Sequence, residues 1–194
     1  MGELWLIRHG ATRWSESGQH TGRTDLPLTE KGIQQARATG ALIAQQRFAT
    51  ALTSPAQRTR HTAELIGLAW AQVEPLLWEW DYGGYEGIST HDIRKERPGW
   101  DVWRDGVIPG ETPGETVDAV GARADAVIEK VQDTLHADQN VAVISHGHMS
   151  RIFIARWLGL PADAGSLFTF ETGHIAICGF ERERHVLRAL NVAG

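Results

Sequence analysis

The sequence is poor in cysteine, and Cys178 is the only one among 194 residues. A single cysteine excludes an intrachain disulfide and any cysteine-based metal cage. The chain also lacks an excess of basic residues, because 19 Lys and Arg stand against 24 Asp and Glu for a net charge of -5. That balance argues against a nucleic-acid partner, which would need a basic face.

Long hydrophobic runs are absent as well. No apolar segment approaches the ~20 residues that a membrane helix needs. No basic region or secretory signal precedes the first apolar segment. We therefore expect no membrane partner and a cytoplasmic location.

Strand-like and helix-like segments alternate along the chain. This alternation predicts an α/β fold with a largely parallel sheet, built as a single domain over residues 1–194. The expected strands cover 4–7, 49–53, 141–145, 175–180 and 186–190. The expected helices run from a Thr29 cap to about 46, from a Ser54 cap with Pro55 in the first turn, over 115–135 and over 149–158.

The segment 76–114 breaks this alternation. It holds several glycines and shows little periodicity. It also contains four tryptophans, which are Trp78, Trp80, Trp100 and Trp103. We interpret it as a Trp-rich cap insertion over one end of the sheet, with a short helix near 91–96. Its aromatic residues either pack the irregular insertion or, for Trp78, Trp80 and Tyr82, line the mouth of a site.

Three polar motifs follow three of the expected strands. They are Arg8-His9-Gly10, the segment 54–58 that ends in Arg58, and His146-Gly147. Ligands of open α/β sheets bind outside the carboxyl ends of the strands. Arg58 would also lie in the first turn of a helix, where free N–H groups favour an anion. The pattern predicts that two imidazoles and arginine meet around a phosphate.

Such a group of residues suits phosphoryl transfer. An arginine fork matches phosphate oxygens, and a neutral imidazole can attack phosphorus to form a phosphohistidine. The reaction also needs an acid for the leaving group and a base for water. Glu79, at the start of the insertion, is the candidate. The alternative is a solvated carboxylate between interfacial aromatic residues.

With these motifs in this order, the chain resembles the histidine phosphatase superfamily, in the branch that contains cofactor-dependent phosphoglycerate mutase. The resemblance runs from Leu4 to beyond Gly147 and implies a three-layer α/β/α fold. It implies that His9 is the nucleophile, that Arg8, Arg58 and His146 hold the phosphoryl group, and that Glu79 is the proton donor. It further implies substrate contacts from Thr21, Gly22 and Gly147, and candidate contacts from Ser15, Tyr82 and Arg104.

Within this family the chain is most similar to small acid phosphatases and to the fungal sedoheptulose-bisphosphatase type, on segments 14–19, 21–22, 24–29, 79–83 and 103–106. Mutases of the branch carry Asn where this chain has Ser15, a cap lysine where it has Thr90, and paired arginines where it has Arg104-Asp105. Fewer cationic groups hold a bisphosphate intermediate less well. The departures therefore favour hydrolysis of small phosphorylated metabolites over mutase activity.

Three further alternatives stay open to test. The His146-Gly147-His148 spacing invites a metal site, but no other ligand follows nearby, and the resemblance implies no metal and no cofactor. His148 is therefore expected at a helix start, partly exposed, and the remaining histidines, including His20, receive surface or structural roles. A non-catalytic phosphate-binding regulatory relative is the rival outside catalysis, and a homodimer is compatible with the family.

Overall fold

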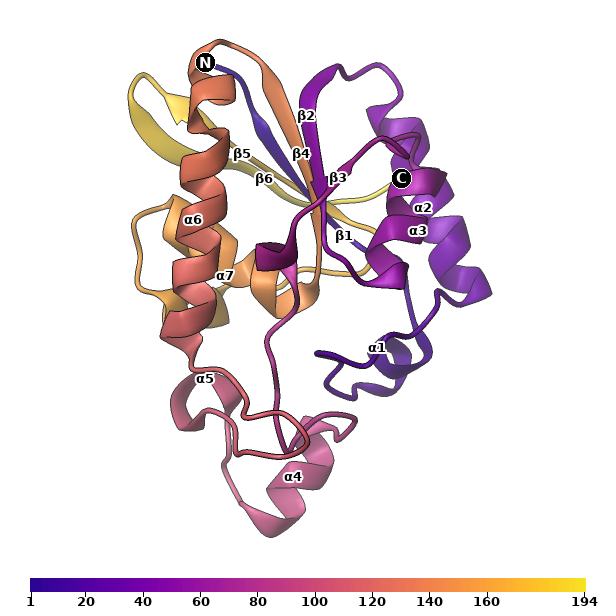
Figure 1. The fold of residues 1–194 in the computed structure, drawn as a ribbon, viewed down its shortest axis with the longest axis vertical. Coiled ribbons are helices and arrows are strands. Elements are labelled where there is room, and N and C mark those ends of the chain that lie inside the picture. The colour runs from indigo at the N-terminus through magenta and orange to yellow at the C-terminus, as the bar shows by residue number, and fades with distance from the viewer.

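A six-stranded sheet runs through the computed structural model, which describes residues 1–194 (Figure 1). The strands, in the spatial order β3-β2-β4-β1-β5-β6, are β1 (Leu4–Arg8), β2 (Phe48–Thr53), β3 (Gln72–Val73), β4 (Asn140–Ser145), β5 (Ile175–Glu181) and β6 (Arg184–Val192). The first four pair in parallel, whereas β5 pairs antiparallel with both β1 and β6. The predicted α/β class with a mostly parallel sheet is confirmed.

Helices cover both faces of this sheet. The side chains of β1 alternate between two cores: Leu4 and Leu6 join the core with α6 (Val117–His136) and α7 (Gly147–Trp157), and Ile7 joins the other. That second core contains residues of α2 (Glu30–Ile43) and α3 (Gln57–Leu65). A strand buried on both faces needs such a continuous apolar run. The three-layer α/β/α architecture is therefore confirmed.

The helix boundaries test the capping predictions. Thr29 caps α2, because its side chain accepts a hydrogen bond from the Gly32 N–H, as predicted. The predicted Ser54 cap is wrong: α3 begins only at Gln57, and its N-cap, Ala56, makes no side-chain bond. The chain stays beside β4 for one residue after β2 ends, because the N–H of Ser54 donates to the Ile144 carbonyl, so the turn comes later. None of the helices combines the length and apolar character needed to cross a bilayer.

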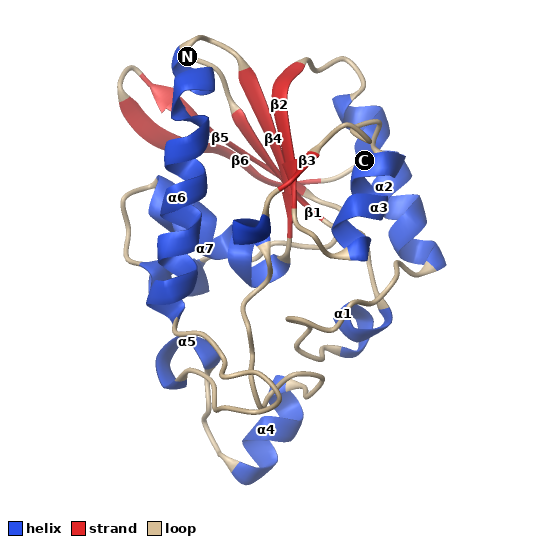
Figure 2. Cartoon of the chain, in the orientation of Figure 1, coloured by secondary structure: helices blue, strands red, loops and turns tan.

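The Trp-rich segment lies beyond one end of the sheet, as Figure 2 shows. It contains α4 (Thr90–Glu96), which matches the expected short helix, and α5 (Val102–Asp105), which was not predicted. Trp80 and Trp100 are buried, so both of them pack the cap. The sequence also missed the short helices α1 (Arg13–Ser17), η1 (Pro75–Leu77) and η2 (Ala162–Leu167).

Candidate active site

The carboxyl ends of β1 and β4 bring two histidines together. Arg8 is in register with Ser145, so the residues that follow, His9 and His146, leave adjacent strands at the same edge. Their ring centroids lie 5.2 Å apart in an edge-to-face arrangement. The predicted convergence of the two imidazoles is thus confirmed as geometry.

His9 is held in one tautomer. Its Nδ1 lies 2.7 Å from the carbonyl oxygen of Gly10. A carbonyl can only accept, so Nδ1 carries the hydrogen and Nε2 keeps a free lone pair. Burial lowers the pKa of His9 well below its ordinary value, and the charges of Arg58 and Arg8 lower it further. His9 is therefore neutral, as a nucleophile must be.

His146 is fully buried behind His9. Its Nδ1 accepts from Nε of Arg58 at 3.2 Å, so its Nε2 carries the hydrogen and donates to the Ser54 hydroxyl at 2.8 Å. Burial first, and then the charge of Arg58, lowers the pKa of His146 well below its ordinary value. The ring also lies parallel to that of Trp78, with 6.4 Å between centroids. Ser54 thus orients an imidazole instead of capping a helix.

Arg58 lies in the first turn of α3, as predicted, and is fully buried. Besides His146, its N–H groups donate to the carbonyls of Thr21, Gly22 and Thr24 at 3.0–3.3 Å. The N–H of Gly22 is occupied as well, by the Glu86 carboxylate at 2.9 Å. The structure therefore places Arg58 and Gly22 behind the site and not on its surface, which corrects the expectation of a free contact from Gly22.

A cavity of about 260 Å³ opens in front of His9. It is lined by Arg8, His9, Ser15, Gly18, Gln19, His20, Thr21, Glu79, Tyr82, Thr90, Gly147, His148, Arg151 and Phe170. Seven of the eleven residues predicted for the site are among them, namely Arg8, His9, Ser15, Thr21, Glu79, Tyr82 and Gly147. Only two of its fourteen lining residues are hydrophobic, and Arg8 and Arg151 supply two cations, which suits a small anionic ligand.

Arg8 lines this cavity, and bonds within the protein use only part of its guanidinium. Its Nη1 donates to the carbonyl of Phe170, while Nε is buried without a partner. Its guanidinium lies against Gly147, where an added Cβ would come within 3.1 Å of Cζ. A guanidinium at the cavity wall with N–H groups to spare is suited to bind an anion oxygen.

Glu79 is 5% exposed, and its carboxylate lies against the first residues of α7. Its Oε1 accepts from the N–H groups of Trp80 and Met149 at 2.9 and 2.8 Å, and its Oε2 accepts from the His148 N–H at 3.0 Å. Helix N-termini favour a carboxylate in this position. Because Oε2 accepts only one bond, it is the oxygen with capacity left for a ligand. The alternative of a solvated carboxylate is wrong.

Arg104 does not reach the cavity. It is exposed, and its guanidinium donates to the Asp105 carboxylate at 2.7 Å and to the Gly99 carbonyl at 2.6 Å, beside a separate hollow. The prediction of a substrate contact from Arg104 is wrong, because its chain neighbour already binds it. A second cation does line the cavity beside Arg8: it is Arg151 on α7, which was not predicted from the sequence.

His148 and His20 also line the cavity. His148 lies at the start of α7 and is partly exposed, as expected, but its Nδ1 is 2.5 Å from the hydroxyl of Tyr82. His20 packs on the Tyr82 ring with centroids 4.6 Å apart, and burial lowers its pKa to about 4. His148 and Arg151 lie one helical turn apart, which is the spacing that could have identified them together.

Comparison with known proteins agrees with this geometry. The model of the histidine phosphatase superfamily (branch 1) matches residues 4–193. An acid phosphatase of Mycobacterium tuberculosis is 42% identical over 193 residues, covering 98% of this chain and 91% of the relative. A sedoheptulose 1,7-bisphosphatase of Saccharomyces cerevisiae is 37% identical over 186 residues, covering 80% and 67%.

The fold agrees too. The solved structure of an open reading frame from Mycobacterium tuberculosis superposes with a TM-score of 0.92 at 41% identity, covering 99% of this chain and 98% of that one. The phosphatase names of the sequence relatives support a phosphoric monoester hydrolase. The match over nearly the whole chain, together with paired histidines at the strand ends, shows that this protein belongs to branch 1 of the histidine phosphatase superfamily.

Proposed function

We propose that the protein hydrolyses small phosphomonoesters, such as sugar phosphates, through a phosphohistidine at His9 and without a metal ion. The observation that carries this is the geometry of His9: its Nδ1 is bound to the Gly10 carbonyl, which leaves Nε2 free. Burial lowers the pKa of the imidazole, which favours the neutral form that a nucleophile needs. The partly unpaired Arg8 beside it would bind the phosphoryl oxygens. A polar cavity of about 260 Å³ suits a small metabolite better than a polymer.

The chemistry proceeds in two displacements. The Nε2 lone pair of His9 attacks phosphorus, the bond to the ester oxygen breaks, and the leaving alkoxide takes a proton from Glu79. Water then attacks the phosphohistidine and gives a proton to Glu79, the N–P bond breaks, and phosphate leaves. Arg8 would stabilise the charge on the phosphoryl oxygens, and Arg58 would hold His146 beside them.

Two features support transfer to water rather than to a second position of the substrate. The cap contributes Thr90 to the cavity wall, where mutases of the family carry a lysine, and Arg104 is turned away to Asp105. Incubation with 3-phosphoglycerate distinguishes the activities. Hydrolysis releases inorganic phosphate, whereas a mutase yields an isomer that keeps its phosphate and is stimulated by bisphosphoglycerate. A phosphate-binding regulator would turn over neither this compound nor p-nitrophenyl phosphate.

The intermediate can be trapped directly. Enzyme mixed with a radiolabelled sugar phosphate and quenched in denaturant should carry label that survives alkali and is lost in acid, as an N–P bond requires. His9→Ala should carry none and should turn over roughly 10³-fold more slowly. His91→Ala, exposed on α4, is the control that removes an imidazole outside the cavity. Near-normal turnover by His9→Ala would overturn the proposal.

A further inference from the structure

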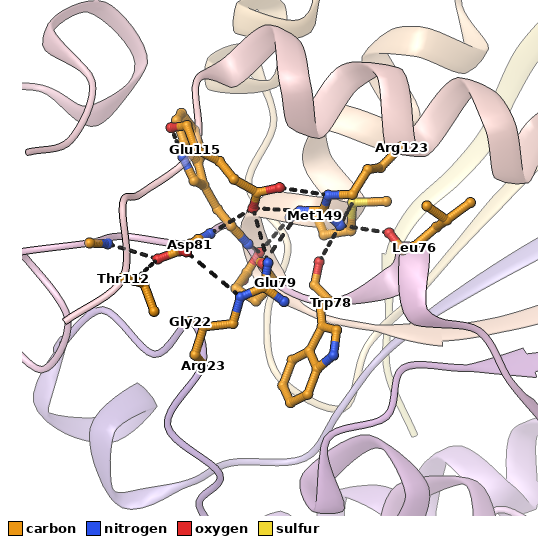
Figure 3. Close-up of polar contacts among 12 residues, drawn as sticks. Gly22, Arg23, Leu76, Trp78, Glu79, Asp81, Thr112, Glu115, Arg123 and Met149 are labelled. Carbon is orange, nitrogen blue, oxygen red and sulfur yellow. Dashed lines mark hydrogen bonds and ion pairs between the residues drawn. The ribbon is translucent and has the colours of Figure 1, made fainter. Parts of the chain in front are cut away.

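One arginine outside the cavity hydrogen-bonds to the backbone around Glu79. Arg123 projects from α6, and its Nη1 donates to the carbonyls of Leu76 and Trp78 at 2.6 and 2.7 Å (Figure 3). Its Nη2 reaches the carbonyl of Glu79 itself at 3.4 Å. Three carbonyls within four residues therefore share one guanidinium, and these are the residues that lead into the cap.

Glu115 binds both Arg123 and the backbone after Glu79. Its two carboxylate oxygens each lie 2.9 Å from a nitrogen of Arg123, in a bidentate pair that fixes the plane of the guanidinium. The same carboxylate accepts the N–H of Asp81 at 2.9 Å, as Figure 3 shows. The backbone is therefore held before Glu79 by Arg123 and after it by Glu115. The pair is mostly buried, with 15% and 18% of the two side chains exposed.

Arg123 and Glu115 together hold a stretch of backbone whose side chains face the site. The Trp78 ring lies parallel to His146, and the Glu79 carboxylate meets the first N–H groups of α7. A shift of this backbone would move the Glu79 carboxylate relative to a leaving group bound at His9. Arg123 itself does not line the cavity, so it acts only through the residues that it holds.

We propose that Arg123 is a positioning residue for proton transfer by Glu79. This inference rests on the proposed function, in which Glu79 protonates the leaving oxygen. A sugar alkoxide is a strong base and leaves only when it is protonated. The p-nitrophenolate ion is a weak base and leaves without help. Misplacing Glu79 therefore slows an alkyl phosphate far more than it slows p-nitrophenyl phosphate.

The test is the ratio of kcat/KM for glucose 6-phosphate to kcat/KM for p-nitrophenyl phosphate on one preparation. This ratio does not depend on how much of the enzyme is folded, so a partly unfolded variant still gives a valid result. We expect Arg123→Gln to lower the ratio about 10-fold, mainly through kcat for the sugar phosphate, because small displacements of reacting groups cost that much. Arg123→Lys keeps the charge beside Glu115 but offers a single nitrogen, so it should restore the ratio in part.

The chain offers a matched control. Arg156 on α7 makes a bidentate pair with Asp125 of α6 at 2.8 and 2.9 Å, like the pair of Arg123, but it lies outside the cavity and holds no segment of the cap. Arg156→Gln should destabilise the fold slightly and leave the ratio unchanged. If Arg123→Gln also leaves the ratio unchanged, Arg123 is merely structural and the inference is wrong.

A second variant, Glu79→Gln, distinguishes a failure of this inference from a failure of the proposed function on which it rests. Glu79→Gln should lower the same ratio by roughly 10²-fold or more, because it removes the proton and not only its position. An unchanged ratio in Glu79→Gln would refute Glu79 as the proton donor. A lowered ratio in Glu79→Gln with a normal ratio in both Arg123 variants would refute only the positioning role.

Discussion

Gly147→Ala should lower activity without lowering stability. Gly147 is the first residue of α7, and a Cβ there would lie 3.1 Å from Cζ, 3.2 Å from Nη2 and 3.3 Å from Nε of Arg8. An ordinary contact between such atoms is about 3.5–4.0 Å. The Arg8 guanidinium must therefore retreat by roughly half an ångström, away from the position in which it lines the cavity.

The magnitudes of the two effects follow from this geometry. A misplacement of about 1 Å costs roughly 100-fold in rate, so half of that should cost about 10-fold in kcat/KM, or about 1.4 kcal/mol. Alanine favours a helix over glycine by up to about 1 kcal/mol. Gly147 is not among the glycines with positive φ, so the methyl group brings no backbone strain. The free energy of unfolding should therefore stay level or rise.

The assay compares kcat/KM for p-nitrophenyl phosphate with the midpoint of urea denaturation. Gly40→Ala in α2 is the matched control, because its Cβ would also lie 3.1 Å from a neighbour, the Cα of Ile66, but far from the cavity. We expect the control to change stability and leave kcat/KM unaltered. Full activity in Gly147→Ala would show that Arg8 does not need its observed position to bind the phosphoryl group.

Three other predictions follow from buried groups. Burial lowers the pKa of His20 to about 4, so between pH 6.5 and 4 the unfolded chain binds a proton that the folded chain refuses, and stability falls as the pH falls. Between pH 7 and 5 this proton costs the folded protein roughly 2 kcal/mol of unfolding free energy. Urea denaturation at the two pH values should show that His20→Gln loses about 2 kcal/mol less than the parent protein. An equal loss in both proteins would contradict the lowered pKa of His20. Ser54→Ala strands the buried Nε2–H of His146 and should cost about 1–3 kcal/mol of unfolding free energy, whereas unchanged stability would mean that the bond is not formed. Burial raises the pKa of the Cys178 thiol, so iodoacetamide should modify it only in denaturant, and rapid native labelling would count against the buried position.

The elements that were predicted well are those whose signal is local. Strand β1 shows a continuous apolar run and Thr29 precedes a helical repeat; each pattern lies within a few residues. The failures lie where distant contacts compete with local preference. Ser54 has the residue type of a cap, yet its hydroxyl serves His146, which is 92 residues away.

The candidate site divides in the same way. His9, Arg8 and Glu79 were identified because strand ends converge at one sheet edge and because their motifs resemble a known family. Arg104 was assigned to the site wrongly, since the direction in which an irregular cap folds leaves no periodic trace in its sequence. Arg151 was missed although it lies one helical turn after His148 on α7.

The sequence alone determined the fold class and the kind of chemistry, through its composition, its strand periodicity and its motifs. Each of these signals lies within a short stretch of the chain. Only the tertiary structure decided which nitrogen of His9 is free, which arginines line the cavity, and that Arg123 holds a carbonyl 44 residues before it. Such contacts depend on how whole layers pack against one another. That packing is set by the sum of many weak interactions across the molecule, and no single segment encodes it.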